Sequence, residues 1–249
     1  MGSGIDKFLG RWHAYFLANS LNPGNIPWGP VDYMPADERR RISASVAAFQ
    51  LGEYSEGKGL LKLAAEYAGR VGSGELTDIT RLFIREEQNH ALLLKRFMGS
   101  QGIEPLKSHW TDWVFRKLRK ALDFELSLTV LVTAEIISLV YYDALHKCTG
   151  SKVLKAICEK ILADEAAHVS YESELILHIR GSRPRLLGCA ENLFHRFLFS
   201  GTVLVVYSGH RRVLRGGGYS FGRFWRSCSA EFSNCFAQRR AVYKLGHIR

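Results

Sequence analysis

Two stretches of this 249-residue sequence decide its fold: Glu86-Glu87-Gln88-Asn89-His90 and Asp164-Glu165-Ala166-Ala167-His168. Both contain the pattern Glu-x-x-His, and both lie in apolar sequence of helical period. Because residues three apart share a helix face, each pattern presents one carboxylate and one imidazole to a common metal. The repetition predicts a bundle in which these two helices each give such a pair to a metal site, while two further helices each give one glutamate.

One buried glutamate is expected on each of the helices that precede the two motifs. Glu135 lies in the middle of the apolar run 130–140, where an ionised carboxylate needs a cation to offset the cost of burial. The earlier helix offers Glu53 and Glu56. Counting residues back from the hairpin turn, at about 1.5 Å per residue, places Glu56 roughly 3 Å out of level with Glu87 and Glu53 roughly 7.5 Å. Glu56 is therefore the predicted ligand, and Glu53 is expected to support it or to replace it.

The sequence thus predicts six metal ligands: Glu56, Glu87, His90, Glu135, Glu165 and His168. Either motif alone would indicate only a solvated helix, but each has a glutamate upstream, 31 residues away in one hairpin and 30 in the other. Oxygen ligands with two imidazoles suit iron, or else manganese, whereas structural zinc prefers thiolates. Tyr142 and Glu172 follow these ligands on the same helix faces and are candidates to contact them from behind. The alternatives are a core tyrosine and a solvated glutamate.

Glycines and prolines mark the boundaries along the chain. Residues 1–36 are predicted to be a lead-in, residues 37–181 the bundle, and residues 182–249 a basic C-terminal extension of two helices around Gly216-Gly217-Gly218. The helices predicted within the bundle are about 37–69, 75–98, 122–146 and 152–179, with an approach helix near 110–118. The predicted fold class is all-α, an antiparallel four-helix bundle with additional N- and C-terminal helices.

The composition is that of an ordinary globular chain, with 47% hydrophobic and 23% charged residues. Its five cysteines are odd in number and form no C-x-x-C pair, which predicts neither a disulfide framework nor a zinc ribbon and favours a cytoplasmic location. The apolar run 126–145 is long enough to span a bilayer, but Glu135 near its middle predicts a buried bundle helix instead. No integral membrane span is expected.

Basic residues gather toward the C-terminal end. Nine arginines and lysines lie from residue 210 onward against Glu231 alone, so this segment carries +8 of the net charge of +10. They alternate with Phe221, Phe224 and Trp225, as in segments that bind a membrane surface or a nucleic acid. The plainer expectation is a packed helix pair with a basic face, and the alternatives are binding of anionic lipid or an acyl substrate, or of nucleic acid.

In the repeated motif and its upstream glutamates, residues 42–178 resemble the ferritin-like superfamily of di-iron carboxylate proteins, which includes rubrerythrins, aldehyde-deformylating oxygenases and arylamine N-oxygenases. The resemblance implies that Glu87 and Glu165 bridge two iron ions. It also implies terminal ligation by two pairs, Glu56 with His90 and Glu135 with His168. The chain lacks the rubredoxin-type cysteine pairs of rubrerythrins, and Ile161 stands where arylamine N-oxygenases carry a further histidine.

The same resemblance implies an oxidoreductase that activates O2 as co-substrate, oxidises an organic substrate of apolar or acyl type and receives electrons from a donor. A first alternative is a ferroxidase or peroxide-scavenging iron protein without an organic substrate. A second is an interaction protein whose metal site is structural. Helices beyond the bundle favour the enzyme, since they offer a wall for a substrate channel, and an oligomeric state is left open.

Overall fold

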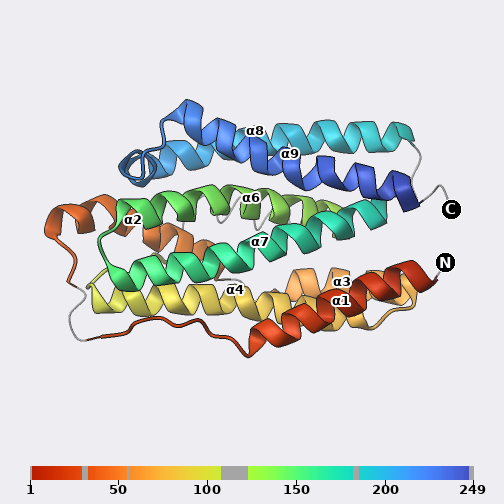
Figure 1. The fold of residues 1–249 in the computed structure, drawn as a ribbon, viewed down its shortest axis with the longest axis horizontal. Helices are drawn as coiled ribbons and strands as arrows, with labels where there is room; N and C mark the ends of the chain where they lie inside the picture. Colours follow the sequence, from red (N-terminus) through yellow and green to blue (C-terminus); the bar gives the residue numbers. More distant parts are fainter. Residues whose placement is uncertain (1, 30–32, 55–56, 108–122, 182–184, 247–249) are drawn as a thin grey trace. The chain divides into compact units, whose positions relative to one another are not determined.

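A computed structural model describes residues 2–29, 33–54, 57–107, 123–181 and 185–246 of the chain (Figure 1). These residues form helices and no strands, and the helix packing is consistent with a bundle, so the predicted all-α class is confirmed. The helices are α1 (Gly2–Ser20), α2 (Ala36–Glu53), α3 (Lys58–Val71), α4 (Glu75–Ser100), α6 (Phe124–Cys148), α7 (Lys152–Arg180), α8 (Arg185–Gly216) and α9 (Phe221–Gly246). The approach helix predicted near 110–118 lies outside the described residues.

Three of these helices begin at a side-chain cap. Asp123 accepts a hydrogen bond from the backbone N–H of Leu126 at 2.9 Å and so caps α6. Ser151 accepts from the N–H of Leu154 at 3.0 Å and caps α7, and Ser220 caps α9 in the same way. Each cap satisfies an N–H that has no partner within the helix, which explains why the predicted starts of these helices lie close to the observed ones.

The first predicted bundle helix, 37–69, is interrupted, which corrects the prediction of one continuous element. Helix α2 ends at Glu53, Tyr54 adopts an extended conformation, and α3 begins after Gly57. Gly57 has φ of 63°, which favours glycine, and a Cβ at this position would lie 2.4 Å from Cδ1 of Ile84 on α4. The chain therefore leaves the helical path at a position that lies close against α4.

Contacts within the chain divide it into two compact units, Met1–Ser127 with Thr149–Ile161, and Leu128–Cys148 with Leu162–Arg249. In the first unit α1, α2 and α3 all pack against α4 (Figure 1). Phe16 of α1 meets Phe83 of α4 edge to face, with ring centroids 6.3 Å apart. The predicted lead-in thus contains a helix with its own core contacts, and the domain boundaries predicted at residues 36 and 181 stay a prediction.

Helix α6 forms much of the core of the second unit. Among the described residues it is the one helix long and apolar enough to cross a membrane, and 83% of its most apolar window is buried inside the structure. Val132, Ile136 and Tyr142 are each fully buried. This burial fits the predicted role of α6 as a core helix.

The turn between α8 and α9 packs against the C-terminal half of α6. Gly217 approaches the backbone of Ala144 so closely that a Cβ would lie 2.3 Å from the Ala144 carbonyl oxygen. Gly218 has φ of 84° and turns the chain toward α9. The hydroxyl of Tyr219 then donates a hydrogen bond to the Asp143 carboxylate at 2.5 Å. The glycine run predicted to separate the two C-terminal helices therefore also allows their close contact with α6.

Candidate metal centre

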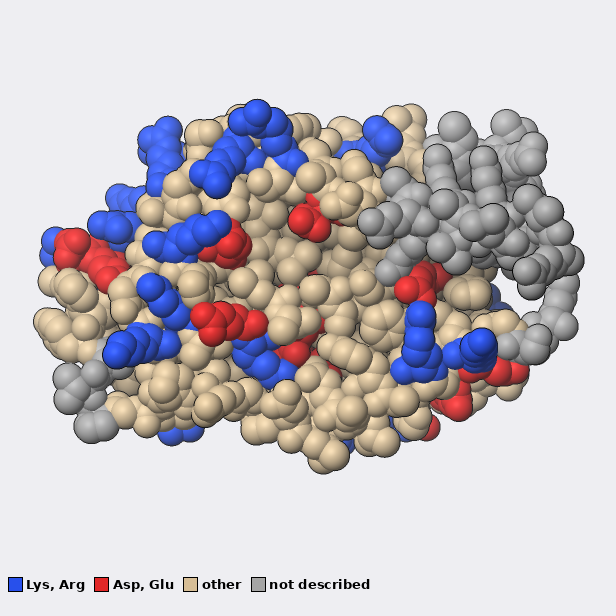
Figure 2. All heavy atoms as spheres, viewed as in Figure 1, with Lys and Arg blue, Asp and Glu red and all other residues tan. Residues whose placement is uncertain are grey.

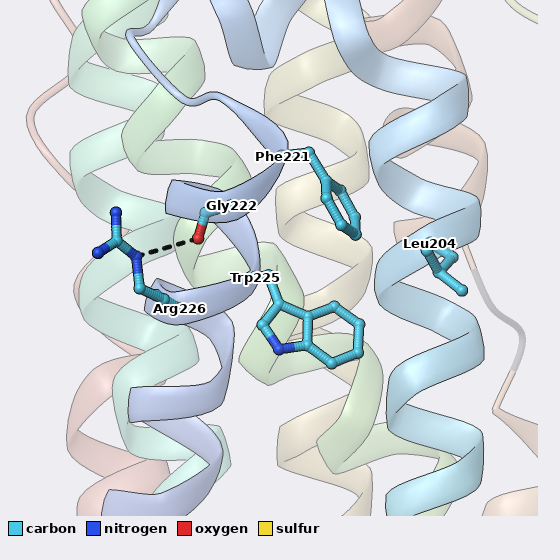
Figure 3. Close-up of a pocket in the computed structure, with 5 residues that line it drawn as sticks. All are labelled: Leu204, Phe221, Gly222, Trp225 and Arg226. Carbon is cyan, nitrogen blue, oxygen red and sulfur yellow. Dashed lines mark hydrogen bonds between the residues drawn. The ribbon is translucent and has the colours of Figure 1, made fainter.

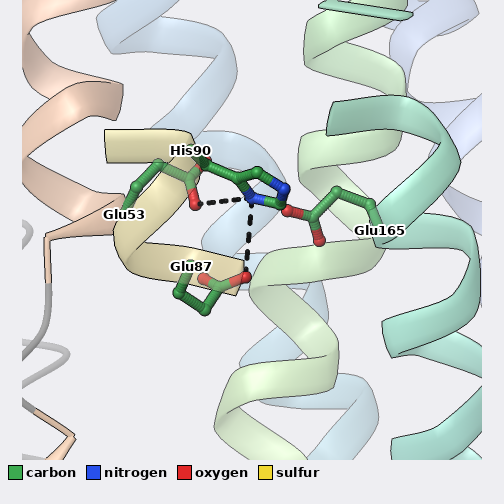
Figure 4. A group of neighbouring side chains, drawn as sticks. All are labelled: Glu53, Glu87, His90 and Glu165. Carbon is green, nitrogen blue, oxygen red and sulfur yellow. Dashed lines mark ion pairs between the residues drawn. The ribbon is translucent and has the colours of Figure 1, made fainter. Parts of the chain in front are cut away.

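The first unit brings together two carboxylates and one imidazole, from Glu53, Glu87 and His90. His90 is fully buried on α4, and its Nδ1 lies 3.7 Å from Oε1 of Glu87, one turn earlier on the same helix. Glu53, the last residue of α2, places its Oε2 3.9 Å from the same nitrogen (Figure 4). The two carboxylates therefore lie near the same ring nitrogen, and we call these residues the first triad.

The second unit repeats this arrangement with Glu135, Glu165 and His168, here called the second triad. His168 is fully buried on α7, and its Nδ1 lies 3.7 Å from Oε2 of Glu165. Oε2 of Glu135, in the middle of α6, lies 3.2 Å from the same nitrogen, which is within hydrogen-bonding distance. Glu135 is 5% exposed and Glu165 only 2%. In the second triad, therefore, one carboxylate lies closer to the histidine than in the first, and both carboxylates are more deeply buried.

Two overlapping sets of these side chains have ligand atoms that all lie within 4.8 Å of one another. The first set is Glu53, Glu87, His90 and Glu165, drawn in Figure 4, and the second is Glu87, Glu135, Glu165 and His168. Glu87 and Glu165 belong to both sets. The chain therefore holds largely buried clusters of carboxylates and histidines that resemble a di-metal site.

The chemistry of these donors fits divalent cations. Buried carboxylates in one place repel one another, and each is costly to bury while ionised unless a positive charge lies beside it. The four carboxylates of the two triads carry four negative charges when ionised, which two divalent ions would balance. Carboxylate oxygen and imidazole nitrogen are ligands that iron and manganese accept. The metal itself is not identified by these residues.

Five of the six predicted ligands lie in these sets: Glu87, His90, Glu135, Glu165 and His168. The sixth, Glu56, lies outside the described residues. Glu53, predicted to support or replace it, is the carboxylate that α2 gives to the first set. The residue count that favoured Glu56 assumed one continuous helix, and the break after Glu53 removes that assumption.

The two residues predicted behind the ligands are both buried. Tyr142 is fully buried on α6 and packs edge to face against Tyr141, with ring centroids 5.2 Å apart. That is the environment of a core tyrosine, which was the alternative considered for it. Glu172 is 1% exposed on α7, so the solvated position considered for it is wrong. Its burial one turn after His168 keeps it a candidate to contact that imidazole from behind.

His195 is a buried polar residue that neither sequence motif includes. It is 2% exposed on α8, and its Nε2 lies 3.0 Å from Oγ1 of Thr133 on α6. Thr133 donates its own hydroxyl proton to the carbonyl oxygen of Thr129, so the imidazole N–H is the donor to Thr133. Burial, and secondarily the charge of Arg180, lowers the pKa of His195 to about 3. A neutral histidine therefore holds α6 two residues before Glu135.

No protein-family model, no curated protein and no solved structure matches the chain. The resemblance to a di-metal site accordingly stands on the side chains themselves. The spacing of the two motifs singled out Glu87, His90, Glu165 and His168. In the structure these side chains are largely buried and lie close together.

Proposed function

We propose that this chain is a ferritin-like di-iron protein in which the two triads hold two metal ions and Glu87 and Glu165 bridge them. The observation that carries this proposal is the membership of both glutamates in both ligand sets. A carboxylate has two oxygens, so Glu87 and Glu165 would each have one oxygen to offer to each of two ions. The remaining residues of each triad then belong to one ion each.

The orientation of the histidines supports the same ligand assignment. Nδ1, rather than Nε2, is the nitrogen that faces the carboxylates in both His90 and His168. A neutral imidazole would thus ligate through Nδ1 and keep its proton on Nε2. Iron is the proposed metal, and manganese is the alternative that the same donors accept.

We further propose that the loaded protein is an oxidoreductase that activates O2 and oxidises an organic substrate of apolar or acyl type. Two bound ferrous ions would supply the electrons that reduce O2, and an external donor would restore them. The chain's part is to hold the ions in a dry site: Val132 and Ile136, beside Glu135 on α6, are fully buried and exclude water. Their apolar surfaces also suit a substrate of the same character.

An anaerobic titration of the metal-free protein with ferrous iron, followed by admission of O2, tests this function. Saturation near two ions per chain, O2 consumption and formation of ferric iron are expected. Uptake of many irons per chain would favour a storage or ferroxidase role instead. Oxidation driven by hydrogen peroxide in preference to O2 would favour peroxide scavenging, and binding of metal without any reaction would favour a structural site.

A matched pair of variants on α7 ties that result to the proposed ligands. Glu165→Ala removes a carboxylate common to both sets, so binding of both ions should be lost. Glu159→Ala removes an exposed carboxylate of the same helix that belongs to neither set, so binding should be unchanged. Retention of two ions by Glu165→Ala would show that the proposed ligand set is wrong.

A cytoplasmic location belongs to the same proposal. The buried thiols of Cys158 and Cys228 are free, and burial raises the pKa of both, that of Cys228 to about 12. They therefore stay protonated and unreactive at neutral pH, as structural cysteines of a reducing compartment do. Fractionation of the native host cell with an antibody against this chain tests the location.

A further inference from the structure

Helix α8 exposes a row of large apolar side chains to water. Leu193 is 71% exposed, Phe197 77% and Leu204 50%. They are spaced by four and seven residues, which places them on one face of the helix. Phe221 at the start of α9 is a further exposed aromatic, at 40%. Exposed apolar side chains gathered in this way mark a surface that contacts another apolar phase.

A groove between α8 and α9 continues this apolar row. It has a volume of about 570 Å³ and is lined by Leu204, Phe221, Gly222, Trp225 and Arg226. Figure 3 shows the rings of Phe221 and Trp225 on one side of the groove and Leu204 on the other. Nε of Arg226 donates to the carbonyl oxygen of Gly222 at 3.2 Å, which holds a guanidinium beside the apolar groove.

Exposed arginines accompany the apolar row and the groove along α8 and the first turns of α9. They lie at positions 196, 211, 212, 215, 223 and 226, whereas the acidic residues of the segment 191–236 are Glu191 and Glu231 alone. Lys and Arg side chains gather around the turn between α8 and α9 (Figure 2). The segment therefore combines exposed apolar side chains with an excess of exposed positive charge.

We propose that this face, which we call the α8–α9 face, docks on the surface of a bilayer that contains anionic phospholipid. Phe197, Leu204 and Trp225 would enter the boundary between headgroups and acyl chains, where aromatic and apolar side chains are stabilised. The arginines would meet the lipid phosphates, which attract basic residues near a negatively charged leaflet. This is an activity in addition to the metal chemistry and does not depend on it.

The chemistry of the α8–α9 face disfavours two other occupants. A second copy of the chain, placed with the same face against itself, would bring two groups of arginines together, and like charges oppose such a contact. Nucleic acid would satisfy the arginines, and bases could stack on the aromatic rings, but the exposed aliphatic side chains of Leu193 and Leu204 would be left without an apolar partner. An anionic bilayer satisfies the charges and the aliphatic side chains together.

Cosedimentation of the full chain with lipid vesicles tests the proposal. Vesicles of phosphatidylcholine with phosphatidylglycerol should bind the protein, phosphatidylcholine alone should bind it weakly, and added salt should reduce the difference. Equal binding to both kinds of vesicle, or to neither, would overturn the proposal. So would a dimer that forms without lipid and is lost in Leu204→Ser, or binding of mixed-sequence DNA that exceeds binding to the anionic vesicles.

Two pairs of variants locate the contact. Leu204→Ser should weaken partition, whereas Leu92→Ser, which alters an exposed leucine of α4, should not. The double variant Arg211→Gln/Arg215→Gln should weaken binding to anionic vesicles by roughly tenfold or more, given the usual attraction of each basic residue to such a surface. Arg40→Gln/Arg85→Gln removes two exposed charges elsewhere and serves as its control. Equal losses in the test and control pairs would refute the assignment to the α8–α9 face, and an unchanged midpoint of urea denaturation would show that the variants are folded.

Discussion

The two halves of the candidate metal centre share the Glu-x-x-His motif, but the helices that supply the additional glutamate, α2 and α6, differ. In the second triad, Glu135 comes from the middle of α6, which is unbroken over 25 residues. In the first, Glu53 is the last residue of α2, where the helix stops. The distance from the carboxylate to the histidine Nδ1 is 3.2 Å in the second triad and 3.9 Å in the first. The carboxylate on the continuous helix thus lies closer to its histidine than the carboxylate at the end of a helix does.

The C-terminal helices are a second difference between the triads, because they support α6 at several points. His195 of α8 donates to Thr133, Tyr219 donates to Asp143, and the backbone of Gly217 lies against α6. A site whose ligands are already held in place loses less conformational freedom on binding. We therefore expect the second triad to bind its ion more tightly than the first.

The largest expected effect separates the two triads directly. Glu135→Ala should abolish tight binding at the second triad, lowering affinity by more than about 100-fold, since even outer partners of a metal site contribute 10- to 100-fold. Glu53→Ala should leave one tightly bound ion per chain. Anaerobic titration with ferrous iron, or with manganese followed by electron paramagnetic resonance, measures both variants. A higher residual affinity in Glu135→Ala than in Glu53→Ala would reverse the expected order.

Glu56→Ala completes that series and decides which carboxylate serves the first triad. If Glu53 is the ligand, Glu56→Ala should bind both ions as the unaltered protein does. If Glu56→Ala loses one ion while Glu53→Ala keeps two, the residue count from the hairpin turn was a better guide than the position of Glu53 beside His90.

This contrast also marks what the sequence could predict. Helices α4, α6 and α7 follow from apolar periodicity and from local signals such as the caps at Asp123 and Ser151. The break after Glu53 does not follow from such local signals. It involves the close contact of Gly57 with Ile84, which lies 27 positions further along the chain. The site divides in the same way: the two motifs and the apolar run around Glu135 indicated the candidate ligands on α4, α6 and α7. On α2, the count along an assumed continuous helix favoured Glu56 over Glu53, the carboxylate next to the break.

A similar limit applies to His195. Nothing near it in the sequence indicates a partner, because Thr133 lies 62 residues earlier. An amphipathic pattern on α8 could have indicated burial of its ring, but not the hydroxyl that it meets. Contacts of this kind follow from tertiary packing, which single-sequence patterns do not contain.

The second prediction compares the two glycines, Gly217 and Gly57, whose backbones lie close against a neighbouring helix. Gly217→Ala should destabilise the protein by about 3 kcal/mol, since its Cβ would meet the Ala144 backbone, which has little freedom to move. Gly57→Ala should cost about 1–2 kcal/mol for its left-handed conformation, with the Ile84 side chain able to yield. Urea denaturation measures both. Gly209→Ala and Gly52→Ala, where a Cβ meets nothing within 4 Å, are the controls and should be neutral or slightly stabilising.

The third prediction tests whether His195 holds α6 only while it is neutral. Its pKa is lowered from 6.5 to about 3 in the folded state, chiefly by burial. Below about pH 6.5 the unfolded chain therefore binds more protons than the folded one, and stability falls as the pH falls. The resulting loss in the free energy of unfolding should reach about 2 kcal/mol at about pH 5 and should vanish above about pH 7. Denaturation of the metal-free protein across this range should show a shallower slope in His195→Gln, and an unchanged slope would contradict the assignment.

The smallest expected effect concerns the hydrogen bond at the other end of α6. Burial raises the pKa of the Asp143 carboxyl, but hydrogen bonds from Lys147 and Tyr219 outweigh it and leave that pKa lowered. Burial and the hydrogen bond to Asp143 raise the pKa of Tyr219 to about 12, so its hydroxyl is a donor at neutral pH. Tyr219→Phe should cost about 1 kcal/mol, because Lys147 still donates to the same carboxylate oxygen.

The pH dependence and metal affinity of Tyr219→Phe sharpen the comparison between the triads. A carboxyl with a lowered pKa contributes stability above its unfolded value, and that stability is lost as the pH falls through the folded pKa. The difference between the unaltered protein and Tyr219→Phe should therefore shrink in acid, as measured by urea denaturation. If support of α6 by the C-terminal helices sets the affinity of the second triad, the variant should weaken that site slightly and leave the first unchanged. Equal weakening of both sites would instead assign the difference between the triads to the break after Glu53.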